Sequence, residues 1–152
     1  MAKRYQPELG TDTVSNLLHI AVGTPMVFTL TGYAETYSIL RRRLNGGTIS
    51  KNDYNLSRTA LRLDVIESLL YQFLPLETHI FLSLPIIDQH NLNSTDAAIL
   101  AAYLEFTHSV GIPCVLIASD HRLLRAARAE GLPALDPETV APDDVPAFLA
   151  AL

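Results

Sequence analysis

The sequence has few of the residues that mark secreted, zinc-binding or membrane-spanning proteins. Its single cysteine, Cys114, excludes an intrachain disulfide framework and a cysteine-based zinc site. The five histidines show no metal-ligand spacing. There is no signal-peptide pattern, and no apolar run approaches the roughly 18 residues that a membrane helix needs. We therefore expect a soluble, cytoplasmic protein with no membrane partner.

Charge is also scarce. Charged residues make up 18% of the 152 residues and hydrophobic residues 49%, which is typical of a globular protein. The net charge of −5 argues against a protein that coats nucleic acid non-specifically, although it leaves room for a local basic patch. No repeat, low-complexity tract or linker divides the chain. We expect a single domain spanning residues 1–152.

Helical and extended patterns alternate along the chain. Strands are predicted at residues 26–31, 79–83, 114–119 and 133–135. Helices are predicted at residues 11–21, from after residue 31 to Asn45, at 50–73, 96–109 and 121–130, and in the tail from Asp143. The expected caps and stops are Gly23-Thr24-Pro25 after the first helix, a Ser50–Asp53 capping box, Thr95, Gly111 and Gly131, with Pro85 opening a brief helix. This alternation predicts an α/β fold with a largely parallel sheet, whose site lies beyond the carboxyl ends of the strands.

Three acidic residues lie where that rule places a site. Glu35 is expected in the first turn of the helix after strand 26–31, Asp120 follows strand 114–119, and Asp96 opens the helix before that strand. Each has a structural explanation, because acids in first helical turns accept free backbone N–H groups and favour the positive end of the helix dipole. If all three converge, the repulsion between two charges about 4 Å apart is roughly 4 kcal/mol at an effective dielectric near 20. Such a cluster takes up protons or binds a cation.

The ligand type indicates which cation. Carboxylate oxygens with no thiolate or histidine nearby favour Mg²⁺ or Mn²⁺ over Zn²⁺. Hard cations held by carboxylates at a strand-end cleft often serve phosphoryl chemistry, because they position a water and stabilise the leaving oxygen.

Three segments resemble, in order, the motifs of the PIN-domain family. Residues 29–35 (TLTGYAE), followed by the arginines at 41–43, resemble its strand and Glu-bearing helix. Residues 93–101 (NSTDAAILA) resemble its Asp-led helix of small residues. Residues 117–132 (IASDHRLLRAARAEGL) resemble its closing strand–Asp–helix–Gly-Leu block. The chain is thus similar to VapC-type ribonucleases, the toxins of bacterial toxin–antitoxin pairs.

The resemblance implies a PIN-like three-layer α/β/α domain with a parallel sheet of about five strands. It implies metal-dependent endoribonuclease activity, with Glu35, Asp96 and Asp120 as catalytic residues and ligands of Mg²⁺ or Mn²⁺. Ser119 and Thr31 have supporting roles beside the metal ligands by the same resemblance. Arg122 and Arg125 are candidates to contact RNA phosphates because they lie just past Asp120, close to the proposed site. The partners it implies are an RNA substrate, a cognate antitoxin protein and a second copy in a homodimer.

The start of the chain departs from the family pattern. Family members begin with a central strand that ends in Asp-Thr-Ser and carries the first catalytic acid. This sequence begins with residues 1–5 (MAKRY), which match the stretch after that strand, so the first acid has no counterpart. Three explanations are open: a natural start upstream, which we favour, a degenerate relative of the family, or a neighbouring chain that fills the gap. Without the strand, backbone groups of its neighbours would be exposed. Ala118 also replaces the usual Thr or Ser, and we expect neither Glu8 nor Asp12 to replace the missing acid.

Two other functions fit the same residues. A catalytically impaired PIN-like module would keep only the binding of an antitoxin, another protein or RNA. An unrelated parallel α/β domain would use its acids only as helix caps. Among the other polar candidates, most of the arginines at 41–43 suit a helix end, and His121 suits the surface.

Overall fold

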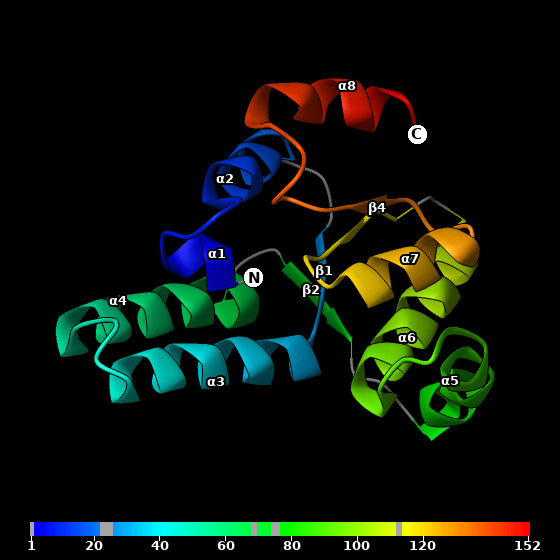
Figure 1. Ribbon diagram of the computed structural model, residues 1–152, viewed down its shortest axis with the longest axis horizontal. Coiled ribbons are helices and arrows are strands. Elements are labelled where there is room, and N and C mark those ends of the chain that lie inside the picture. Colours follow the sequence, from blue (N-terminus) through cyan, green and yellow to red (C-terminus); the bar gives the residue numbers. More distant parts are fainter. Residues whose placement is uncertain (1, 22–25, 68–69, 74–76, 112–113) are drawn as a thin grey trace. The chain divides into compact units, whose positions relative to one another are not determined.

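The computed structural model describes residues 2–21, 26–67, 70–73, 77–111 and 114–152, which form two compact units, Met1–Leu74 and Pro75–Leu152 (Figure 1). The elements of the first unit are α1 (Ala2–Tyr5), α2 (Thr11–Ile20), β1 (Met26–Thr29), α3 (Leu30–Asn45), α4 (Lys51–Arg62), a π-helical segment (Leu63–Glu67) and β2 (Leu70–Phe73). Those of the second unit are α5 (Glu77–His90), α6 (Ser94–Val110), β3 (Leu116–Ile117), α7 (His121–Ala129), β4 (Ala134–Leu135), a 3₁₀ turn (Pro142–Asp144) and α8 (Val145–Ala150).

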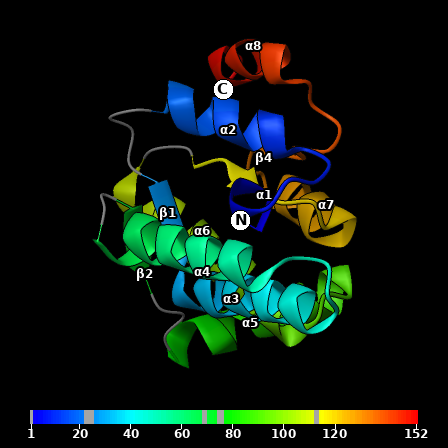
Figure 2. The ribbon, with the colours of Figure 1, turned by 90° about the vertical axis from the view of Figure 1, so that its left-hand side faces the viewer.

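The first unit is built on the paired helices α3 and α4, which lie side by side (Figures 1 and 2). Their facing sides enclose a core with Leu40, Leu61 and Val65 fully buried and Tyr54 almost so. Strands β1 and β2 pair in parallel, with Met26 opposite Leu70. This pairing needs a crossover connection, and α3 and α4 supply it.

A reciprocal capping box begins α4, as the sequence predicts. The Ser50 hydroxyl accepts from the Asp53 backbone N–H at 3.1 Å, and the Asp53 carboxylate accepts from the Ser50 N–H at 3.3 Å. Because the box satisfies backbone donors that the helix leaves free, Ser50→Ala should lower the unfolding free energy by about 1 kcal/mol. Urea denaturation of Ser50→Ala and Ser50→Thr measures this, since threonine keeps the hydroxyl. Equal midpoints for the two variants would contradict the role of the cap.

The second unit packs α5, α6 and α7 around a separate core. Leu100, Leu124 and their neighbours are buried there, and β3 and β4 pair in parallel, with Leu116 opposite Ala134. Gly111 follows α6 and Gly131 follows α7, both with positive φ, the conformation that glycine adopts most readily. The two predicted helix stops are therefore confirmed.

The predicted helix over residues 50–73 is wrong in its second half. Regular α-helix ends at Arg62, the π-helical segment ends at Glu67, and residues 70–73 form strand β2. A short apolar run such as LYQF suits a strand or a buried helix equally well by periodicity. The pairing with β1, more than forty residues earlier in the sequence, is what favours the strand.

The predicted strand over residues 79–83 is also wrong, because α5 runs through it from Glu77 to His90. Pro85, expected to open a helix, lies inside this one, where a proline removes a backbone hydrogen bond. Among the α5 residues whose side chains are described, His79, Ser83 and Ile86 are buried, at helical spacing. The helix thus forms despite the proline, and its buried face packs against α6.

The α/β class is confirmed in its coarse form: helices predominate, they alternate with strands, and both strand pairs are parallel. In the described ranges each sheet has two strands. The strand predicted at 114–119 is limited to Leu116–Ile117, and the predicted break at residues 23–25 lies outside the described residues. The single domain over residues 1–152 stays a prediction. No helix in the described part of the chain has the length and apolar character to cross a bilayer.

Candidate functional site

Asp96 and Asp120 line one pocket of about 400 Å³ in the second unit. Asp96 lies in the first turn of α6, and Asp120 lies between the end of β3 and the start of α7. The pocket is lined by Leu92, Asn93, Asp96, Ser119, Asp120, His121 and Arg122. The two acids are thus brought together at the carboxyl end of β3.

Asp120 caps α7. Its Oδ1 accepts from the backbone N–H groups of Arg122 at 2.8 Å and Leu123 at 3.0 Å. This is the structural explanation that a helix start offers for any aspartate. The second oxygen, Oδ2, makes no hydrogen bond to a residue that the structure describes. Asp120 therefore keeps one oxygen for a ligand while it caps the helix with the other.

Asn93 caps α6, so the predicted cap at Thr95 is wrong. Its Oδ1 accepts from the Asp96 N–H at 2.9 Å, and its amide donates to Asp96 Oδ2 at 2.6 Å. Asparagine is as good an N-cap as threonine or better, and it lies at the position that reaches the third helical residue. Asn93 therefore fixes the backbone and one carboxylate oxygen of Asp96.

The Asp96 carboxyl has a raised pKa in this pocket. Burial raises the pKa of Asp96, hydrogen bonding from Asn93 opposes the rise, and the charge of Asp120 raises the pKa further. The Asp120 contribution means that the two carboxylates are close enough to repel. A cation between them would relieve both the burial cost and the repulsion.

Of four further residues considered from the sequence, three line this pocket: Ser119, His121 and Arg122. Arg122 lines it, whereas Arg125 is exposed on α7 and is not among the lining residues. Ser119 lines it too, and its hydroxyl is buried with no hydrogen-bond partner among the described residues. His121 is 82% exposed, as expected for a surface residue.

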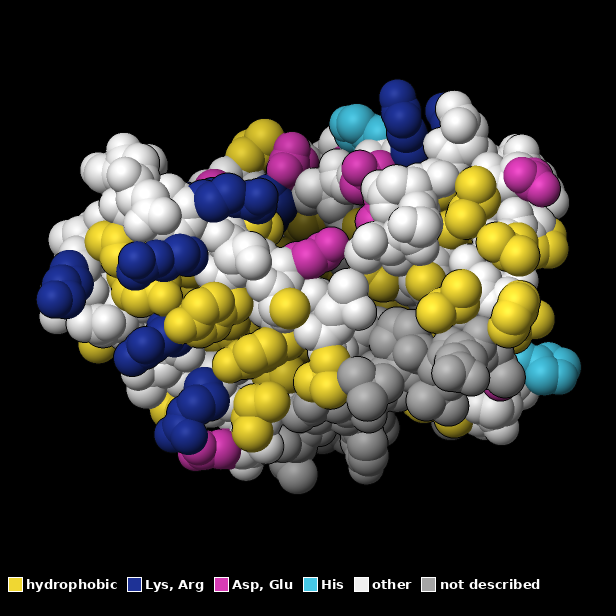
Figure 3. Space-filling model, turned by 90° about the horizontal axis from the view of Figure 1, so that it is seen from below, with side chains coloured by type: hydrophobic (Ala, Val, Ile, Leu, Met, Phe, Trp, Pro, Cys, Tyr) yellow, Lys and Arg dark blue, Asp and Glu magenta, His cyan; other side chains and the backbone are white. Residues whose placement is uncertain are grey.

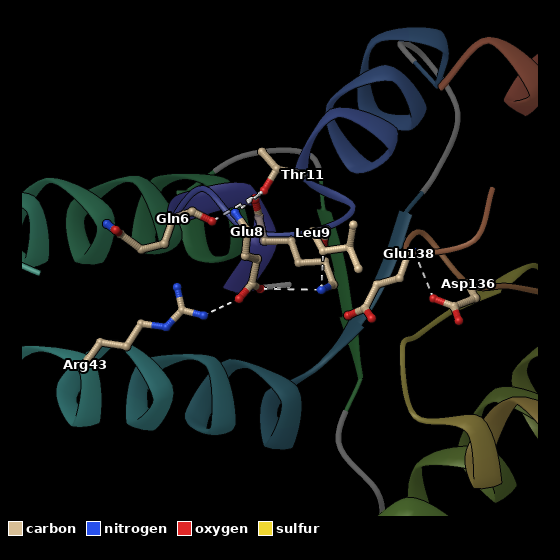
Figure 4. Close-up of polar contacts among 8 residues, drawn as sticks. Gln6, Glu8, Leu9, Thr11, Arg43, Asp136 and Glu138 are labelled. Carbon is tan, nitrogen blue, oxygen red and sulfur yellow. Dashed lines mark hydrogen bonds and ion pairs between the residues drawn. The ribbon is translucent and has the colours of Figure 1, made fainter. Parts of the chain in front are cut away.

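Asp136 is an acid of this region that the sequence reasoning missed. It directly follows β4 and is buried, with 3% of its surface exposed. Its Oδ1 accepts from the Glu138 N–H at 2.9 Å, as Figure 4 shows, and its Oδ2 lies 3.8 Å from Nδ1 of His121. The signal was present, since an acid directly after the strand predicted at 133–135 meets the rule that selected Asp120.

Glu35 belongs to the first unit, where it is exposed on α3. The helix begins earlier than predicted, because Thr29 is its N-cap and accepts from the Gly32 N–H at 3.0 Å. Thr31 consequently lies in the first turn and Glu35 in the second. The expectation that Glu35 lies in the first turn is therefore wrong, and its role as a metal ligand stays a prediction.

Glu8 does not offer a spare carboxylate. Figure 4 shows it directed at Arg43 of α3, with which it forms an ion pair, and it lies 3.7 Å from the Lys3 ammonium. A carboxylate held between two cations is already neutralised. Arg43 therefore has a structural role in this pairing, and the expectation that Glu8 does not replace a catalytic acid stays a prediction.

The donor set of the pocket suits magnesium better than zinc. In the described ranges, no group of three or more His, Cys, Asp and Glu side chains is arranged to hold a metal. Magnesium is commonly bound through one or two carboxylates, with waters and substrate phosphates as its other ligands. Asp96, with one oxygen engaged by Asn93, and Asp120, with one oxygen engaged in the α7 cap, fit that description.

Comparison with known proteins gives no relative from which to transfer a function. No protein-family model matches the sequence, and neither the curated proteins nor the solved structures include a match. The functional interpretation therefore depends on the residues themselves.

Proposed function

We propose that this chain is a Mg²⁺- or Mn²⁺-dependent endoribonuclease of the PIN-domain toxin type, with the family's three-layer α/β/α fold. The observation that carries the proposal is the shared pocket of Asp96 and Asp120, at the carboxyl end of a parallel strand. The motif resemblance identifies the same two residues independently of this geometry. A cognate antitoxin and a second copy of the chain are the proposed partners.

The residues of the pocket have separable roles in this proposal. Asp96 and Asp120 would hold the cation, which when bound neutralises phosphate charge and activates water for hydrolysis. Asn93 positions Asp96 through two hydrogen bonds, so the carboxylate is oriented before a ligand arrives. Arg122 supplies a guanidinium at the pocket edge, the group that best pairs with phosphate oxygens.

Asp120→Asn tests the proposal with the helix cap kept, because asparagine caps as well as aspartate. We expect RNA cleavage in Mg²⁺ to fall by at least about tenfold, because the variant lacks a charged ligand oxygen. The measurement is the rate of cleavage of a labelled RNA, with EDTA as the metal-free reference. Asp88→Asn, an exposed acid on α5, is the matched control. Unchanged cleavage in Asp120→Asn would leave Asp120 as a cap alone.

The second candidate is a PIN-like module that binds an antitoxin, protein or RNA without chemistry. The observation in its favour is that the pocket contains two of the acids expected at a PIN site, one of which is engaged as a cap. Titration of the chain with Mn²⁺ separates the candidates. Metal binding that Asp120→Asn weakens, together with cleavage, supports the nuclease, whereas RNA binding that is insensitive to metal and never leads to cleavage supports the module.

A further inference from the structure

A second polar cleft lies in the first unit, between α3 and α4. It has a volume of about 270 Å³ and is lined by Tyr33 and Tyr37 from α3 and by Arg58, Thr59 and Arg62 from α4. No acidic residue is among these lining residues. The helical part of this unit, at the left of Figure 3, carries Lys and Arg side chains interspersed with hydrophobic ones.

Two residues of the cleft, Tyr37 and Arg58, contact the buried ring of Tyr54. The Tyr37 and Tyr54 rings pack edge to face with their centroids 6.3 Å apart. The guanidinium groups of Arg41 and Arg58 each lie 5.8 Å from the centroid of the Tyr54 ring. Hydrogen bonding from Tyr54 and then from Arg58 lowers the pKa of Tyr37. The cleft is therefore a connected set of aromatic and cationic groups.

The positive charge at the cleft has little internal compensation. Among the described residues, neither Arg41 nor Arg58 forms a salt bridge, and Arg62 pairs only with the exposed Glu67, at 2.8 Å. Arg58 and Arg62 are four residues apart on one helix, where like charges repel. The same distribution extends over the unit: residues 1–74 contain eight Lys and Arg against six Asp and Glu, whereas residues 75–152 contain three against ten. An anion at the cleft would relieve this repulsion.

We propose that this Tyr–Arg cleft binds a nucleotide unit of single-stranded RNA, with the base against the tyrosines and the phosphate on Arg58 and Arg62. Aromatic faces next to a basic groove are the combination by which proteins hold single strands. An acidic peptide would use the guanidinium groups but not the aromatic side chains of Tyr33 and Tyr37 that line the cleft. The inference rests on the proposed function only in the choice of RNA as the nucleic acid.

The test is binding of a labelled single-stranded RNA of about ten nucleotides, followed by fluorescence anisotropy in EDTA. For the double variant Arg58→Gln/Arg62→Gln we expect the Kd to rise at least about tenfold, and the salt slope to fall by about 0.7, because one neutralised phosphate is lost. Tyr33→Leu, which keeps an apolar side chain, should raise the Kd about fivefold through lost stacking. The matched control is Arg42→Gln/Lys51→Gln, with the same charge change at exposed residues of the same unit.

Three outcomes would overturn this inference: an unchanged Kd in the Arg58/Arg62 variant, equal loss in the control variant, or displacement of the RNA by polyglutamate at equal concentration. Adenosine monophosphate that binds as tightly as the RNA would overturn the assignment to a strand and leave a free nucleotide as the ligand. Because binding is read without metal, this test is separate from the cleavage assay on Asp120→Asn. Cleavage that depends on Asp120, with binding that ignores Arg58 and Arg62, would refute the cleft and spare the nuclease.

Discussion

Asp96→Asn is expected to lower RNA cleavage by at least about 100-fold while the folded protein stays as stable as before or becomes more stable. The substitution keeps the size and the hydrogen bond to Asn93 but removes a charge that the protein accommodates at a cost. That cost is visible in the raised pKa of Asp96, which arises first from burial and then from the charge of Asp120. Opposite effects on activity and stability distinguish a ligand residue from a structural one.

The pH dependence of stability gives an independent check on Asp96. Its folded-state pKa lies above the unfolded value, so the folded protein binds the proton more tightly than the unfolded chain does. Stability conferred by the protonated carboxyl is therefore present below the unfolded pKa of 3.8 and is lost as pH rises through the raised folded pKa. Asp96→Asn should lack this decline.

Urea denaturation of Asp96→Asn across the acidic range measures the effect, and Asp88→Asn serves as the exposed control. The binding of metal by each variant shows whether activity and ligation fall together. If Asp96→Asn lost stability as well as cleavage, Asp96 would be a structural residue of the α6 start, and the proposed site would lose its half-buried ligand.

The sequence predicts those parts of the site whose position is set by residues nearby in the sequence. Asp120 follows an apolar run and precedes an amphipathic helix, so its place at a strand-to-helix junction is local information. Asp96 is similarly placed by the start of α6. Asp96 and Asp120 are 24 residues apart in the sequence, and the rule that sites lie at strand ends predicts that they lie close together. The shared pocket agrees with that rule.

The parts that the sequence could not predict depend on contacts between distant segments. Residues 70–73 have no local preference that separates strand from helix, and their partner β1 is far away in the chain. The sequence around Pro85 predicts a strand and a new helix start, because proline disfavours the interior of a helix. The continuous helix depends on burial of the His79–Ser83–Ile86 face against α6, which is a tertiary contact. The Tyr–Arg cleft likewise requires the side-by-side packing of α3 and α4, which no spacing within one helix reveals.

Leu100→Ala is the substitution expected to cost the fold most. Leu100 is fully buried in α6 and belongs to the core that α6 forms with α7 and the ends of β3 and β4. Removing its branched side chain forfeits apolar burial and leaves a cavity, so the unfolding free energy should fall by about 2–5 kcal/mol. Leu84→Ala on α5, where the side chain is 51% exposed, should change it by no more than about 0.5 kcal/mol.

Leu100→Ala should also affect the candidate metal site, because Leu100 lies one helical turn after Asp96 on α6. Urea midpoints at constant slope measure the stability loss in each variant. For the fraction of Leu100→Ala that remains folded, Mn²⁺ binding should weaken more than in Leu84→Ala, since the turn that carries Asp96 loses its anchor. A Leu100→Ala protein as stable as Leu84→Ala would mean that α6 is not held by this core. Asp96 would then depend on the Asn93 cap alone for its position.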